Sequence, residues 1–198
     1  MSGDPALSRR RLLLLAPAGL LAAGLAGTAG WLLTRPEEQG VPIGGPFELV
    51  DGNARTVTDQ AFRGKWMLVY FGYTHCPDAC PMALQNMAAA RDLLGPAAAR
   101  VSLVFITLDP ERDTPEVMRD YAASFGPDIS ALTGSPEAVS RAAKAYRVYS
   151  AKAPAGGGDY SVDHTSIIYA MDPRGRFAAN FTHETTPEAI AARLRALV

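Results

Sequence analysis

The chain is expected to fold as an α/β sandwich, in which helices cover the faces of a central β-sheet. Two continuous apolar runs, KWMLVYFGY (65–73) and VSLVFITLD (101–109), have the composition of buried strands, and a helical pattern follows each of them. A hairpin and a last helix follow near the C-terminus. This alternation predicts parallel strands in the middle of the sheet and an antiparallel pair at one edge.

Each segment of the domain carries a local signal for its element. The turn residues Asp51-Gly52-Asn53 predict a hairpin between segments 47–50 and 55–57. Pro81 suits the first position of a helix whose apolar spacing continues over 82–94. The remaining elements are helices over 115–125, over 136–147 and from 187, a flexible loop over 153–160, and strands over 165–172 and 176–181. This order is the thioredoxin-like arrangement, and the domain is predicted to cover residues 47–198.

The N-terminal part of the chain differs in kind from the domain. Segment 12–33 is uncharged, and at about 1.5 Å per helical residue it reaches roughly 33 Å, enough to cross a bilayer. We expect residues 1–11 to stay in the cytoplasm, because three arginines precede the apolar segment. The favoured interpretation is a single-pass transmembrane anchor in the cytoplasmic (inner) membrane. Residues 34–46, rich in proline and glycine, then form a linker to a domain that faces the periplasm.

A second interpretation of this segment is an export signal. SRRRL (8–12) resembles a twin-arginine signal, and Gly27-Thr28-Ala29 is an acceptable cleavage site. Both interpretations place the domain outside the cytoplasm, where exposed thiols tend to oxidise. The formal net charge of −1 offers no basic face, so no nucleic-acid partner is expected.

Both cysteines of the chain, Cys76 and Cys80, lie in YFGYTHCPDACPM (70–82), where the first buried strand ends and a helix begins. Amide groups at a helix N-terminus stabilise thiolates, so this position lowers cysteine pKa values. The pair is therefore a candidate for redox exchange through a disulfide bond or for metal binding. Two cysteines and three histidines do not favour a four-ligand zinc site or an iron–sulfur cluster, whereas Cu(I) accepts two thiolates and one imidazole.

Three histidines could complete such a site: His75, His164 and His183. His75 is next to Cys76, but neighbouring side chains at a strand end diverge, and His183 has the pattern of a surface residue. His164 immediately precedes a strand that, in thioredoxin-like folds, packs beside the cysteine turn and usually begins with a cis-proline. No proline occurs between Pro154 and Pro173. His164 is therefore the predicted third ligand.

Four acidic residues near these motifs have both a functional and a structural interpretation. Asp78 could tune the thiolates or act as a turn or cap residue. Asp109 and Asp113 could rim the site or meet a partner, and Asp113 could instead cap the helix that follows it. Asp163 could orient the neighbouring histidine by a hydrogen bond.

The sequence resembles the SCO/SenC family of copper-binding proteins that assemble cytochrome c oxidase. Over residues 45–198 the resemblance is carried by YFGYTHCPDACP, VFITLDPERDTP and YSVDHTSIIYAMDPRGRF, with a membrane segment ahead of them. It implies a thioredoxin-like fold and copper ligands at Cys76, Cys80 and His164. It also implies copper delivery to the binuclear copper centre of oxidase subunit II, thiol-disulfide reduction of that subunit's cysteines, or both.

We therefore expect a copper metallochaperone, a binding and transfer protein rather than an enzyme with turnover. Its cofactor is Cu(I), with Cu(II) left open. The expected partners are oxidase subunit II, a periplasmic copper donor or thiol reductant, and the membrane. The main alternative is a membrane-tethered thiol-disulfide reductase with Cys76 and Cys80 as the redox-active pair, and a peroxidase is a third.

Overall fold

The computed structural model describes residues 42–197 of the chain. The predicted anchor or signal over 12–33 and most of the predicted linker lie outside these residues. Within 42–197, none of the helices combines the length and the apolar character that a membrane crossing requires.

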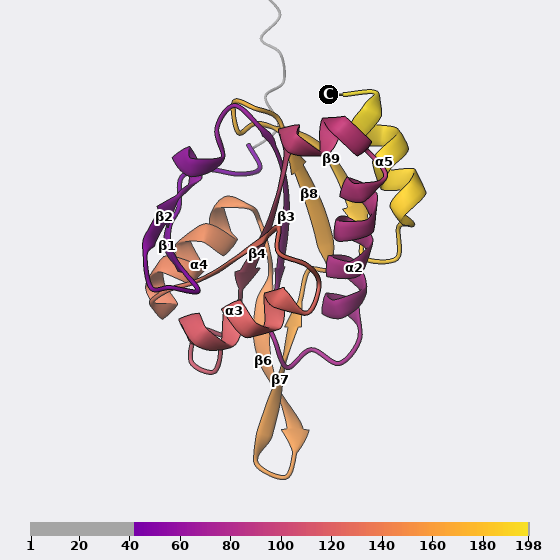
Figure 1. Cartoon of the computed structure of the whole chain (residues 1–198). Helices are drawn as coiled ribbons and strands as arrows, with labels where there is room; N and C mark the ends of the chain where they lie inside the picture. The colour runs from indigo at the N-terminus through magenta and orange to yellow at the C-terminus, as the bar shows by residue number, and fades with distance from the viewer. Residues whose placement is uncertain (1–41, 198) are drawn as a thin grey trace, which may run out of the picture. The chain divides into compact units, whose positions relative to one another are not determined.

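The described residues form the predicted mixed α/β architecture around a seven-stranded sheet (Figure 1). The elements in chain order are β1 (Glu48–Asp51), β2 (Thr56–Thr58), η1 (Asp59–Phe62), β3 (Trp66–Gly72), α2 (Ala79–Asp92), η2 (Gly95–Arg100), β4 (Val101–Thr107), α3 (Pro115–Ala123), β5 (Ile129–Thr133), α4 (Pro136–Ala145), β6 (Ser150–Gly156), β7 (Asp159–His164), β8 (Ile167–Met171), β9 (Phe177–Thr182) and α5 (Pro187–Arg195). The strand order in the sheet is β2-β1-β5-β4-β3-β8-β9, and β6 pairs only with β7.

The central strands β3, β4 and β5 are parallel, as the alternating pattern predicts. Antiparallel strands flank them on both sides, β1 and β2 at one edge and β8 and β9 at the other, whereas the sequence predicted an antiparallel pair at one edge only. The difference arises because β5 was not predicted. Its five residues lie between the helix-breaking pairs Gly126-Pro127 and Ser135-Pro136, and they are too few to show a clear apolar period.

Different helices pack on the two faces of the sheet at the central strand β3. Tyr70 stacks on Phe105 of β4, and Phe105 packs against Tyr121 of α3. Phe71 points to the opposite face, where it packs against Tyr146 at the end of α4. All of β3 from Met67 to Gly72 is buried, which explains why its sequence is a continuous apolar run.

Segment 153–160 forms the turn of a β-hairpin and the adjoining ends of its two strands, not the flexible loop that its glycines suggested. Strands β6 and β7 pair in antiparallel register from Ser150 opposite His164 to Gly156 opposite Asp159. Gly156, Gly157 and Gly158 all have positive φ, between 62° and 90°, a conformation that favours glycine. The three glycines therefore make the turn, and the hairpin carries His164 at its end.

Helix α2 begins at Ala79, two residues before the predicted start at Pro81. Cys80 therefore lies in the first turn of the helix, where the free backbone amides are. Asp78 occupies the N-cap position, but its side chain makes no capping hydrogen bond. The predicted cap role of Asp78 is therefore not seen.

A buried carboxylate ties the cysteine loop to the neighbouring strand. Asp113 is completely buried, and it accepts hydrogen bonds from the hydroxyl of Thr74 at 2.6 Å, the amide of Thr74 at 3.1 Å and the hydroxyl of Thr107 at 2.6 Å. It does not cap α3, because the Thr114 hydroxyl accepts from Val117 instead. Burial also means that Asp113 cannot meet a partner protein.

We predict that Asp113→Ala lowers the free energy of unfolding by about 3 kcal/mol, because it leaves buried hydrogen-bond donors without an acceptor. Urea unfolding of the reduced, metal-free protein measures this change. Asp120→Ala is the matched control, since Asp120 pairs with Arg119 on the surface and its loss should cost less than about 0.5 kcal/mol. Equal stability of the two variants would contradict the structural role of Asp113.

Candidate metal centre

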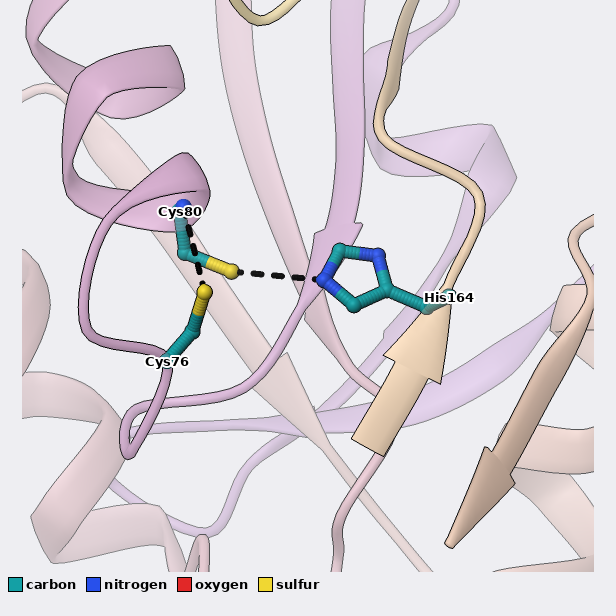
Figure 2. Close-up of side chains that lie close together, drawn as sticks. All are labelled: Cys76, Cys80 and His164. Carbon is teal, nitrogen blue, oxygen red and sulfur yellow. Dashed lines mark hydrogen bonds between the residues drawn. The ribbon is translucent and has the colours of Figure 1, made fainter. Parts of the chain in front are cut away.

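The structure brings the three predicted ligands together from three different places in the chain. Cys76 lies in the loop between β3 and α2, Cys80 lies in the first turn of α2, and His164 is the last residue of β7 (Figure 2). One ligand atom from each lies within 4.8 Å of the others. Among residues 42–197, this is the one group of three or more His, Cys, Asp or Glu side chains that is arranged to hold a metal ion.

The Cys80 sulfur is buried beside the end of β3, and a glycine makes room for it. A Cβ atom on Gly72 would lie 2.5 Å from Cys80 Sγ and 3.1 Å from Cε2 of Phe105. Any larger residue would therefore displace the sulfur or the core ring. A glycine inside a strand pattern often marks such a close approach, so this signal was available in the sequence.

Two tyrosine rings enclose the imidazole of His164. Tyr70 and Tyr73 both meet it edge to face, with ring centroids 6.1 Å and 5.9 Å away. The Nδ1 atom lies 3.1 Å from the carbonyl oxygen of Thr165, which can only accept a hydrogen bond. This contact assigns the proton to Nδ1 and leaves the lone pair of Nε2 free, 3.6 Å from Cys80 Sγ.

The two thiols differ strongly in acidity. A hydrogen bond from Cys80, together with the backbone amides of Asp78 and Cys80, lowers the pKa of Cys76 to about 3. The amide of Cys80 lies 3.4 Å from Cys76 Sγ. The hydrogen bond to the Cys76 thiolate and burial raise the pKa of Cys80 well above its usual range. Cys76 is therefore the thiolate, and Cys80 keeps its proton until a cation replaces it.

The other histidines stay outside the group. His75 is exposed, and its Nδ1 contacts the hydroxyl of Thr74 at 3.1 Å. His183 follows β9, and its carbonyl oxygen accepts a hydrogen bond from Asn86 of α2. His183 is partly buried, and its buried Nδ1 atom finds no hydrogen-bond partner in the described part of the chain, so it is not the surface residue that the sequence suggested.

Asp163 does not orient His164. It is exposed on β7, and the partner of the His164 ring is the Thr165 carbonyl. Successive side chains of a strand point to opposite faces, which separates the two. Asp109 is completely buried and so cannot rim the site or meet a partner. The enclosing residues Tyr70 and Tyr73 were not singled out from the sequence, because their apolar context is that of a strand core.

The arrangement permits two kinds of chemistry. Two sulfurs and one imidazole nitrogen can bind a soft cation that accepts low coordination. The two cysteines are free thiols in the structure, and their proximity also allows a disulfide to form and break. Each reaction uses up the thiols that the other needs.

We predict that metal-free, reduced protein is alkylated at Cys76 by iodoacetamide at a rate that changes little from about pH 5 to pH 8. The pKa of about 3 means that the reactive thiolate is already present throughout this range. In Cys80→Ala, which removes the main hydrogen-bond donor, the rate should fall as the pH is lowered below the new, higher pKa. Mass spectrometry of the alkylated peptide measures both profiles. Superimposable profiles would show that Cys80 does not control the acidity of Cys76.

Comparison with known proteins identifies the family of the chain. A family model described as SCO1/SenC matches residues 35–198. Protein SCO1 homolog 1 from Arabidopsis thaliana is 44% identical over 136 residues, which are 68% of this chain and 41% of the relative. Protein SenC from Rhodobacter capsulatus is 42% identical over 149 residues, 75% of this chain and 67% of the relative. The chain spans about half the length of the first curated relatives that it matches.

Solved structures agree with these matches. The copper-bound structure of ScoI from Bradyrhizobium japonicum has a TM-score of 0.73 and 46% sequence identity, and the match covers 79% of this chain and 99% of that one. This likeness confirms the predicted thioredoxin-like fold of the domain. With a family model that spans most of its length and relatives above 40% identity, the chain belongs to the SCO1/SenC family.

Proposed function

We propose that this protein binds copper through Cys76, Cys80 and His164 and delivers it during the assembly of cytochrome c oxidase. The observation that carries this proposal is the convergence of the three ligand atoms within 4.8 Å. The copper bound to ScoI of Bradyrhizobium japonicum, a relative with the same fold, supports the choice of metal.

The chemistry of the donors fits Cu(I). Two thiolates supply the charge and the softness that Cu(I) prefers, and the imidazole adds a neutral third donor. Cys80 is buried, but Cys76 and His164 are partly exposed. The ion would therefore be held at the surface, where a partner's ligands can reach it. Such access is what transfer requires, and it distinguishes a carrier from a closed structural site.

The proposed acceptor is the binuclear copper centre of oxidase subunit II, as the family resemblance implies. A periplasmic donor would supply the copper, and a thiol reductant would keep the two cysteines reduced. Oxidation to the disulfide removes both thiolates from the metal, so copper loading and redox state are linked.

A second function, thiol-disulfide reduction of the same subunit, is favoured by the acidity of Cys76. Its thiolate would attack a disulfide of the target and release one target thiol, and Cys80 would then displace the second target thiol as it forms a disulfide with Cys76. This function gives no role to His164. A peroxidase would need polar groups that support one activated cysteine. It is not favoured, because the hydroxyl of Thr74, two residues before Cys76, is already bonded to Asp113 at 2.6 Å.

We predict that the reduced protein binds one Cu(I) per chain and that the oxidised protein does not. Cys76→Ala and Cys80→Ala should nearly abolish binding, while His164→Ala should lower the affinity at least about 10-fold, because a neutral donor contributes less than a thiolate. Competition with a Cu(I) chelator under anaerobic conditions measures the affinities.

The same His164→Ala variant separates the two functions. A copper carrier loses oxidase assembly in cells, whereas a pure reductase keeps both its disulfide-reducing activity and oxidase assembly. His75→Ala is the matched control, since His75 lies beside Cys76 but outside the metal group. A folded His164→Ala protein with native Cu(I) affinity would remove the histidine from the site.

We also propose that segment 12–33 attaches the protein to the cytoplasmic membrane with its domain in the periplasm. The proposal rests on the uncharged sequence behind three arginines. The full-length protein should sediment with membranes and resist a carbonate wash, which removes proteins held only by charge. A mature soluble protein that begins near Gly30 would show instead that the segment is a cleaved export signal.

A further inference from the structure

The hairpin that carries His164 stands apart from the main sheet. Within residues 42–197, strands β6 and β7 pair only with each other, and Figure 1 shows the hairpin extending away from the seven-stranded sheet. A two-stranded hairpin is marginally stable alone, so its position depends on contacts with the rest of the domain. Most of its side chains are exposed or partly exposed, and Val162 is the buried exception.

Arg112, in the loop between β4 and α3, makes the densest set of these contacts. Its Nη1 atom donates to the carboxylate of Asp159 and to the carbonyl oxygen of Tyr160, both at 3.0 Å, and both residues belong to β7. Its Nε atom donates to the buried carboxylate of Asp109. The hydroxyl of Tyr160 donates to the other oxygen of Asp109 at 2.8 Å. Arg112 and Asp109 therefore both bind β7 of the hairpin and hold it against the domain.

The same guanidinium also approaches the rings around the site. Its Cζ atom lies 3.8 Å from the ring centroid of Tyr160 and 5.9 Å from that of Tyr73. Tyr73 in turn meets the ring of His164 edge to face. A short path of direct contacts thus leads from Arg112 to the imidazole. A second tether, between Lys152 and Glu111 at 2.7 Å, is exposed on both sides and should contribute little.

The hydrogen bonds of Arg112 go to Asp109 and to β7, and none of those that the described residues make joins Arg112 to Cys76 or Cys80. The cysteine loop is fixed separately, through the bonds from Thr74 to Asp113, and Cys80 is fixed by helix α2. Loss of the hydrogen bonds between Arg112 and β7 should therefore make the position of the imidazole less fixed, while the positions of both thiols stay unchanged.

We propose, on the basis of the copper-binding function above, that Arg112 is a positioning residue that holds His164 against the two cysteines. Arg112, Asp109 and Tyr160 together form a latch, which fixes the third ligand and sets how easily it leaves the metal. Opening the latch converts a three-ligand site into a two-thiolate site without unfolding the domain.

The test is Arg112→Lys, which keeps a positive charge beside buried Asp109 but loses the planar fork that reaches both Asp109 and β7. We expect it to lower Cu(I) affinity about 10- to 100-fold, the typical effect of losing a residue that orients a ligand. In a His164→Ala background the same substitution should have almost no further effect. X-ray absorption of the Cu(I) form should lose its nitrogen scatterer and keep two sulfurs.

Two further variants serve as a control and as a replacement for Arg112→Lys. Arg55→Lys is the control, since the Nε and Nη2 atoms of Arg55 both bind the carboxylate of Asp51 beside the β1–β2 turn, and it should leave Cu(I) affinity unchanged. Tyr160→Phe removes only the hydroxyl that binds Asp109, and it should weaken binding in the same direction. It replaces Arg112→Lys in every measurement if that variant does not fold.

An equal loss of Cu(I) affinity for Arg112→Lys with and without His164 would overturn the proposal, because the substitution would then act through the cysteines or the fold. Unchanged affinity and unchanged coordination would overturn it as well. Absence of Cu(I) binding by the native protein would refute the proposed function instead. The role of Arg112 in positioning His164 would then be tested on metal-free protein. Arg112→Lys should accelerate hydrogen exchange of the β7 amides and shift the His164 ring signals in NMR spectra. Native values for both would refute that role.

Discussion

The burial of the Cys80 sulfur is the constraint around which the metal centre is arranged. The sulfur occupies the space that the missing side chain of Gly72 leaves at the end of β3, against the rings of Tyr70 and Phe105. The hydrogen bond to the Cys76 thiolate and burial together raise the pKa of Cys80, so Cys80 holds its proton and Cys76 becomes the charged partner. One buried sulfur thus creates an unequal pair, with one thiol ready to react and one that ionises when a cation arrives.

Two buried carboxylates hold the surroundings of this pair in place. An ionised group inside a protein is costly unless hydrogen bonds satisfy it, and Asp109 and Asp113 are both completely buried and both satisfied. Asp113 binds the loop that leads to the cysteines, while Asp109 binds Arg112 and, through Tyr160, the hairpin that carries His164. The short segment after β4 therefore fixes the cysteine loop and the hairpin that carries His164 through separate hydrogen bonds.

This separation is consistent with a carrier of copper. The cysteines lie four positions apart at one junction of strand and helix. The histidine comes from a two-stranded hairpin outside the main sheet. Polar contacts with Arg112, the buried side chain of Val162 and the continuation of the chain into β8 connect this hairpin to the domain. A site built in this way can keep the metal with two strong ligands while a third is exchanged for a ligand of the acceptor.

The sequence alone determined strands β3 and β4 and the position of the cysteines at a strand-to-helix junction, and it made His164 the candidate third ligand. These depend on apolar periodicity, on residue type and on the absence of a proline before β8. The sequence did not predict β5, whose five residues are too few to show a period, and it took the β6–β7 hairpin for a loop, since glycines indicate a turn but not the pairing of its arms. Only the tertiary structure decided what Asp109, Asp113, Arg112 and Tyr160 do. Their roles depend on contacts between segments up to 51 residues apart, and no local pattern in the chain records which buried charge meets which distant donor.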